Sequence, residues 1–151
     1  MQTSHDGIAQ AFIIIEFKPM NKAVLTGQIV ELLSAYPEVR IAILFGSMAS
    51  ATNTPESDLD LALYGERRLS SALTMNLIQQ LASIAKCPID LIDMRVVGEP
   101  ILGNILTKGE RILGSNTDFG LLLSRYLIDK ADFYPYRERL LQERQQRWIR
   151  E

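Results

Sequence analysis

Two short apolar segments that follow each other without an intervening helix constrain the fold of this chain most. Residues 41–45 are Ile-Ala-Ile-Leu-Phe, and residues 58–64 alternate between acidic and apolar side chains before becoming apolar throughout. Both patterns are typical of β-strands, the first of a fully buried one. Residues 47–57 between them are rich in Ser and Thr, which predicts a polar loop or a loop with one helical turn. Two strands joined in this way favour a mixed sheet over a doubly wound parallel one.

The rest of the chain alternates between helical and strand patterns. Apolar residues recur at helical spacing from Val24 to Leu33, and Pro37 closes that helix. Ser70 and Ser71 can cap a second helix. The further expected elements are a β-rich segment at 89–97, a short helix at 99–107 with Pro100 at its first position, a short strand at 110–113, a helical segment from Thr117 to a break near Pro135, and a charged helix at 136–150. The expected fold class is α+β, a mixed α/β sheet flanked by helices.

The length and composition are those of one globular domain. Of the 151 residues, 47% are hydrophobic and 23% are charged, and no linker or repeat divides them. The net charge of −2 argues against stable binding of nucleic acid by charge alone. No apolar run approaches the length of a membrane span, and the single Cys87 fits a cytoplasmic protein. Residues 1–19 are expected to be a tail or an extension upstream of a domain starting near Met20, with an edge strand at 12–17 as the alternative.

Two aspartates at the start of the second strand are the strongest indication of chemistry. Side chains alternate along a strand, so Asp58 and Asp60 project from the same face. Two adjacent carboxylates repel each other and require a neutralising partner. A divalent cation provides one, and oxygen ligands suit Mg²⁺ or Mn²⁺. The pattern therefore predicts a metal site at Asp58 and Asp60.

A glycine-serine pair ends the preceding strand and predicts a phosphate site beside the metal. Gly46 permits a positive φ and a close approach of the backbone to a ligand. Ser47 offers a hydroxyl and a backbone N–H to a phosphate. A two-metal site usually needs a third carboxylate, and Asp90 and Asp93 are candidates. They are three positions apart and point to opposite faces of a strand, so only one can join the site, and parity does not say which.

The spacing Gly46-Ser47, ten residues, then Asp58-x-Asp60 resembles the signature of the DNA polymerase β-like nucleotidyltransferase superfamily, in its minimal single-domain branch. The segments ILFGSMASATNTPESDLDLAL, PIDLIDMRVVGEPILGNILTKGERIL and RYLIDKADFYPY are similar to the same branch, so the resemblance runs from about residue 22 to 140. It implies a palm-like mixed sheet in a core at 20–116, followed by a C-terminal helical segment of the same domain at 117–151. It also implies that Asp90 is the third carboxylate, with Asp93 on the other face, salt-bridged to an arginine.

The resemblance also implies a function. Members of this branch are antitoxins of HEPN/MNT toxin–antitoxin pairs that transfer AMP from ATP to a tyrosine of a HEPN ribonuclease toxin. On this reading Asp58, Asp60 and Asp90 are the catalytic and metal-binding residues, Gly46 and Ser47 bind the nucleotide, and 117–151 binds the partner. The cofactor is Mg²⁺, with Mn²⁺ as the alternative. The alternative functions are a non-catalytic binding antitoxin and a small-molecule nucleotidyltransferase of the aminoglycoside type.

Overall fold

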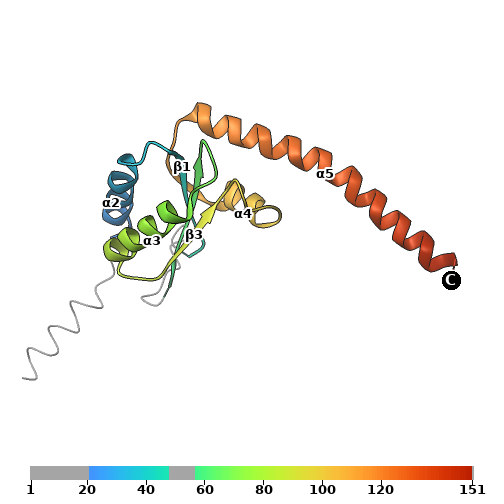
Figure 1. The fold of residues 1–151 in the computed structure, drawn as a ribbon, viewed down its shortest axis with the longest axis horizontal. Helices are drawn as coiled ribbons and strands as arrows, with labels where there is room; N and C mark the ends of the chain where they lie inside the picture. The colour runs from blue at the N-terminus through green and yellow to red at the C-terminus, as the bar shows by residue number, and fades with distance from the viewer. Residues whose placement is uncertain (1–20, 48–56, 151) are drawn as a thin grey trace, which may run out of the picture. The chain divides into compact units, whose positions relative to one another are not determined.

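The computed structural model describes residues 21–47 and 57–150, so the expected tail and most of the expected loop at 47–57 lie outside the described residues. In chain order the elements are α2 (Lys22–Ser34), β1 (Val39–Phe45), β2 (Leu59–Gly65), α3 (Ser71–Ala85), β3 (Ile89–Asp93), α4 (Ile101–Lys108), β4 (Glu110–Leu113) and α5 (Asn116–Arg150) (Figure 1). In this part of the chain, none of the helices has the length and apolar character needed to cross a lipid bilayer.

The four strands form one mixed sheet in the order β3-β2-β1-β4. β1 pairs antiparallel with both β2, the next strand in the chain, and β4, the last one. β2 and β3 are parallel, and α3 is the crossover between them. The mixed sheet expected from the sequence is therefore confirmed. The register aligns Asp60 of β2 with Asp90 of β3 and with Phe45 of β1.

The hydrophobic core lies between one face of the sheet and the helices α2 and α3, which lie side by side (Figure 1). Alternate residues of β2 point into it, and each fully buried leucine contributes about 1.5–3 kcal/mol to folding. Its buried members are Leu25, Ile29, Leu33, Val39, Ala42, Leu44, Leu59, Leu61, Leu63, Leu77 and Leu81. Asp60 lies between two of these leucines in sequence, so its side chain points to the opposite face of the sheet.

Side-chain caps in the sequence begin the helices α2 and α3. The Asn21 side-chain oxygen accepts a hydrogen bond from the Ala23 N–H at 3.0 Å and begins α2. The Ser70 hydroxyl accepts from the Leu73 N–H at 3.1 Å and begins α3, as the sequence predicted. α4 begins at Ile101, so Pro100 occupies the cap position rather than the first helical position.

The expected strand at 89–97 ends at Asp93, so its second half was predicted wrongly. The Asp93 carboxylate accepts a hydrogen bond from the Arg95 N–H at 2.9 Å. The Asp93 carbonyl accepts from the N–H groups of Val96 and Val97, at 3.0 and 3.1 Å. These bonds turn the chain, because an Asp side chain that binds the backbone two residues on stabilises a turn. The β-branched residues of this segment could not outweigh that local effect.

The break predicted near Pro135 is also wrong, because α5 continues through it to Arg150. A proline inside a helix removes one backbone hydrogen bond and crowds the preceding turn, which destabilises the helix by about 3 kcal/mol. Long helical stretches precede and follow Pro135, and a proline in such a context bends a helix rather than ends it. The chain divides into two compact units, one ending at Leu113 and one beginning at Gly114.

Candidate functional site

Three carboxylates project from the sheet face opposite the core. Asp58 directly precedes β2, Asp60 is the second residue of β2, and Asp90 is the second residue of β3. The parallel register places Asp60 and Asp90 side by side on adjacent strands, and side-chain alternation places Asp58 on the same face. Asp58 and Asp90 are exposed and Asp60 is half-buried. The structure therefore brings together the three acids that the sequence singled out.

The turn after β1 lies against the Asp60 carboxylate. Gly46 has a φ of +69°, a backbone conformation that residues other than glycine rarely adopt. A Cβ on Gly46 would lie 2.1 Å from Oδ2 of Asp60, so the carboxylate occupies the space that any other side chain would need. Ser47 follows directly and is half-buried. The glycine thus joins the predicted phosphate site to the predicted metal site, a contact that the sequence spacing alone did not show.

The arrangement of the acids is electrostatically unfavourable without a partner. Burial raises the pKa of Asp60, and the charges of Asp90 and Asp58 and a hydrogen bond with Asp90 raise it further. Each of these effects disfavours the ionised form of the carboxyl. A cation beside Asp60 would reverse the balance, because an opposite charge favours the ionised form.

The donor set fits a hard divalent cation that keeps ligands from outside the protein. Asp60 and Asp90 offer adjacent carboxylate oxygens, which Mg²⁺ prefers. Within residues 21–47 and 57–150, no group of three or more His, Cys, Asp or Glu side chains is arranged to hold a metal ion by itself. Mg²⁺ sites in enzymes that act on nucleotides are usually of this open kind, with one or two carboxylates completed by water and substrate phosphates.

Comparison with known proteins identifies the family. The sequence profile of the family described as polymerase beta, nucleotidyltransferase matches residues 27–118, more than half of the chain. This chain belongs to the polymerase beta nucleotidyltransferase family. The matched range contains all five candidate residues of the nucleotidyltransferase, Gly46, Ser47, Asp58, Asp60 and Asp90.

A curated relative is the protein adenylyltransferase MntA of Shewanella oneidensis, 29% identical over 82 residues, which are 54% of this chain. The match spans 59% of the length of MntA. Solved structures share the fold. One is a toxin–antitoxin complex with AMP-PNP (TM-score 0.68, 24% identity, 78% of this chain and 96% of the other). Another is a tri-AMPylated Shewanella oneidensis HEPN toxin in complex with an MNT antitoxin (TM-score 0.66, 22% identity, 82% of this chain and 98% of the other).

The second acid of β3, Asp93, has a structural role in this nucleotidyltransferase. It is three residues after Asp90 and points to the other face of the sheet, as parity predicted. Its two carboxylate oxygens accept hydrogen bonds from the backbone N–H groups of Leu69 and Arg95, both at 2.9 Å. Within residues 21–47 and 57–150, Asp93 forms no ion pair with an arginine, so the pair that the resemblance implied is wrong and two backbone contacts take its place.

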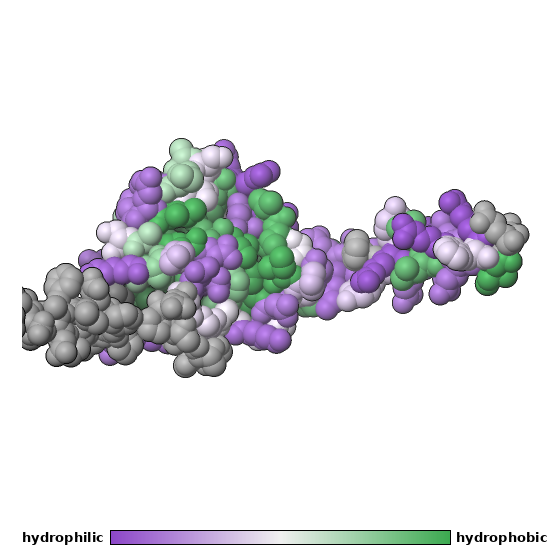
Figure 2. Space-filling view, turned by 90° about the horizontal axis from the view of Figure 1, so that it is seen from below, coloured by the Kyte–Doolittle hydropathy of each residue, from purple (hydrophilic) through white to green (hydrophobic). Residues whose placement is uncertain are grey.

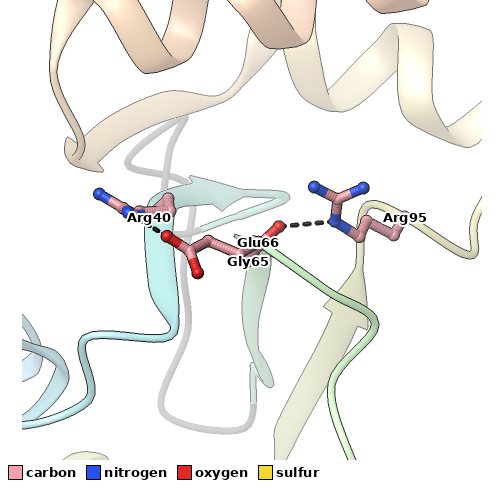
Figure 3. Close-up of polar contacts among 4 residues, drawn as sticks. All are labelled: Arg40, Gly65, Glu66 and Arg95. Atoms are coloured by element: carbon pink, nitrogen blue, oxygen red, sulfur yellow. Dashed lines mark hydrogen bonds and ion pairs between the residues drawn. The ribbon is translucent and has the colours of Figure 1, made fainter.

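Several arginines lie near the other end of β2 from Asp60. Arg67 and Arg68 come shortly after Gly65, the last residue of that strand. The Arg95 Nε donates to the Gly65 carbonyl at 2.6 Å (Figure 3). The Arg95 guanidinium also lies 4.4 Å from the Tyr64 ring centroid. Arg40 forms an ion pair with Glu66 at the same end, which lowers the pKa of the Glu66 carboxyl. These contacts connect the C-terminal end of β2 to β1 and to the turn after β3, at the end of the sheet away from the three acids.

Cys87 offers no reactive thiol to the site. Its side chain is partly buried against the hydrophobic core. Burial raises the pKa of the Cys87 thiol, so the neutral form predominates at physiological pH. A partly buried thiol of this kind acts as a small apolar side chain.

Replacing Gly46 by alanine is expected to displace Asp60 and weaken catalysis by about a hundredfold, because small misplacements in active sites have effects of that order. Because Gly46 has a positive φ, alanine at this position should also lower the free energy of unfolding by about 1–2 kcal/mol. Gly27→Ala is the matched control, since nothing lies within 4 Å of a Cβ on Gly27 in α2. Initial rates and thermal unfolding of both variants check this. Wild-type activity in the Gly46→Ala protein would contradict the contact with Asp60.

Proposed function

We propose that this protein is an antitoxin that transfers AMP from ATP to a tyrosine hydroxyl of a HEPN ribonuclease toxin and so neutralises it. The observation that carries the proposal is the same-face set of Asp58, Asp60 and Asp90 beside the Gly46-Ser47 turn. Membership of the nucleotidyltransferase family supports the reaction class. The similarity to MntA, a protein adenylyltransferase, and the shared fold with antitoxins solved in toxin complexes support the kind of substrate.

The side chains of the site have distinct tasks in this reaction. Ser47 and the backbone N–H groups beside Gly46 hold the triphosphate of ATP. The acceptor tyrosine oxygen forms a bond to the α-phosphorus, and the bond from that phosphorus to the β-phosphate oxygen breaks, so pyrophosphate leaves. Asp90 accepts the proton of the tyrosine hydroxyl. Asp58, Asp60 and Asp90 would hold Mg²⁺, or Mn²⁺, which when bound neutralises the phosphate charge and acidifies the attacking hydroxyl.

A reaction that uses ATP requires the compartment in which ATP is made and kept. We therefore place the protein in the cytoplasm, and its single thiol suits the reducing conditions there. Its partners in this proposal are ATP and the toxin protein, without a stable complex with nucleic acid.

The test is the intact mass of the purified toxin after incubation with this protein, ATP and Mg²⁺. A gain of one or more adenylate units is expected, and it should be absent when the metal is chelated. Peptide mapping should place the added group on a tyrosine. A toxin that is inhibited without any gain in mass would contradict the proposal and favour a non-catalytic binding antitoxin. Modification of aminoglycosides but not of the toxin would favour a small-molecule enzyme.

Ser47→Ala is expected to weaken AMP transfer by about 1–3 kcal/mol of transition-state stabilisation, or about five- to 150-fold, because one or two phosphate hydrogen bonds are lost. The serine positions the triphosphate and forms no covalent bond, since no histidine or other base lies beside it in the sequence to activate it. Steady-state kinetics and mass spectrometry measure both points. A trapped adenylyl group on Ser47 would contradict this role.

A further inference from the structure

α5 carries a line of large apolar side chains, beginning at Leu127, that the site does not use. Leu127, Tyr134, Leu141 and Trp148 are each seven residues apart, and their exposed fractions are 59%, 46%, 50% and 85%. Seven residues are close to two helical turns, so these four side chains form one ridge along the helix. We call them the α5 ridge. The space-filling view shows such hydrophobic side chains interspersed among hydrophilic ones on this helix (Figure 2).

A row of cations runs beside the α5 ridge. Each lies three residues after a ridge residue: Lys130, Arg137 and Arg144. We call these three the basic row. The Lys130 ammonium lies 5.6 Å from the ring centroids of both Tyr126 and Tyr134, so its charge is held at the ridge. Arg144 and the ridge residues Leu141 and Trp148 also line a shallow hollow together with Gln145 and Ile149. Apolar and cationic groups are therefore combined on one surface.

The acids of this part of α5 lie mostly elsewhere on the helix. Helical spacing places Asp129, Asp132 and Glu143 on the face opposite the ridge, and Arg139 and Arg147 are each four residues from Glu143. Glu138 is the carboxylate closest to the ridge, on the border away from the basic row. Among the described residues, Arg137 and Arg144 take part in none of the ion pairs. Arg137 and Arg144 thus offer positive charge at the ridge that none of these ion pairs neutralises.

From this combination we infer that the α5 ridge and the basic row bind an amphipathic helix of the protein substrate, with carboxylates along one border of its apolar stripe. The inference rests on the proposed function, since the substrate is the HEPN toxin. A ridge of residues seven apart fits the groove of a facing helix, and aromatic and arginine side chains are common anchors of interfaces. Carboxylates opposite the basic row would supply the complementary charge and fix the register.

A second copy of this chain and a membrane fit the surface less well. In a parallel pair of α5 helices, the positions three after the ridge face each other, so each cation of the basic row would meet its own copy. A helix that binds a lipid surface has a broad apolar face opposite a basic one. The α5 ridge is one residue wide, and the opposite face carries the acids Asp129, Asp132 and Glu143.

The test uses the full-length protein and the purified toxin. R137E/R144E is expected to weaken toxin binding by about tenfold to a hundredfold in calorimetric titrations, because it reverses two charges at the interface. L141A/W148A is expected to weaken binding at least as much, because it removes ridge anchors. The matched control R125E/R139E makes the same change in net charge on the opposite face, because each of these arginines is two positions before a ridge residue, and it should stay within about twofold of wild type. Circular dichroism checks that all variants keep their helix content.

Each outcome separates this surface from the proposed reaction. Equal weakening by R137E/R144E and R125E/R139E, or wild-type binding in both, would overturn the docking surface. A dimer, or binding to phosphatidylserine vesicles, that is lost in L141A/W148A while toxin binding is unchanged would also overturn it. A wild-type protein that binds the toxin through the ridge but transfers no AMP would refute the proposed function and leave the surface standing. No binding of the toxin by the wild-type protein would refute both.

Discussion

Changing Asp58 and Asp60 together to asparagine is expected to reduce AMP transfer by about a thousandfold or more. Metal ions stabilise the charge of such transition states by several kcal/mol, and the two carboxylates are the core of the proposed metal site. The same change should leave the free energy of unfolding equal to or above that of the wild type. Asp60 is half-buried beside Asp58 and Asp90, and its pKa is raised by burial and by their charges, so its ionised form opposes folding.

The pH dependence gives this prediction a second readout. A carboxyl whose pKa is raised on folding binds its proton more tightly in the folded state. The wild type therefore loses stability as the pH rises from the ordinary pKa of aspartate through the raised pKa of Asp60. Below the ordinary pKa of aspartate, both states are protonated and the penalty disappears. The stability advantage of D58N/D60N should therefore be present at neutral pH and vanish in acid. D129N/D132N in α5 is the control of equal charge change and should transfer AMP at nearly the wild-type rate. Wild-type transfer by D58N/D60N would exclude a metal site at these residues.

The fold was largely predictable because its elements are encoded locally. The apolar run at 41–45 corresponds to the second part of β1, and the alternation after Asp58 corresponds to β2. The direct succession of these two strands in the sequence favoured a mixed sheet, which the strand pairing confirms. Ser70 caps α3 by a hydrogen bond to a residue three positions away, an interaction within reach of sequence patterns.

The features that were predicted wrongly or missed depend on competition between interactions, or on contacts between distant residues, which a local sequence pattern does not show. The end of β3 at Asp93 is set by a side chain that binds its own backbone rather than by the β-propensity of the residues that follow. The passage of α5 through Pro135 depends on helical turns on both sides that outweigh one lost hydrogen bond. The contact between Gly46 and Asp60 joins the turn after β1 to β2, and only the register of the antiparallel pair reveals it.

The choice between Asp90 and Asp93 as the third acid of the site is the question on which the structure adds most to the sequence pattern. Parity required that they face opposite sides but gave no reason to prefer one of them. The parallel register aligns Asp60 with Asp90 and Leu63 with Asp93, and Leu63 is part of the hydrophobic core. Asp90 therefore lies on the same sheet face as Asp60, while Asp93 lies on the face of α2 and α3. Two substitutions of identical chemistry, three residues apart, should consequently have different effects.

Asp90→Ala is expected to lower AMP transfer by about 10²–10⁴-fold, because it removes the proposed proton acceptor and metal ligand, while nucleotide binding and unfolding change little. Asp93→Ala should retain transfer per folded molecule but lose about 1–3 kcal/mol of stability, because the backbone N–H groups of Leu69 and Arg95 lose their acceptor in a half-buried place. Single-turnover rates, nucleotide titrations and denaturant unfolding of both variants distinguish these roles. A stable but inactive Asp93→Ala protein beside an active Asp90→Ala protein would mean that the chemistry takes place on the other face of the sheet.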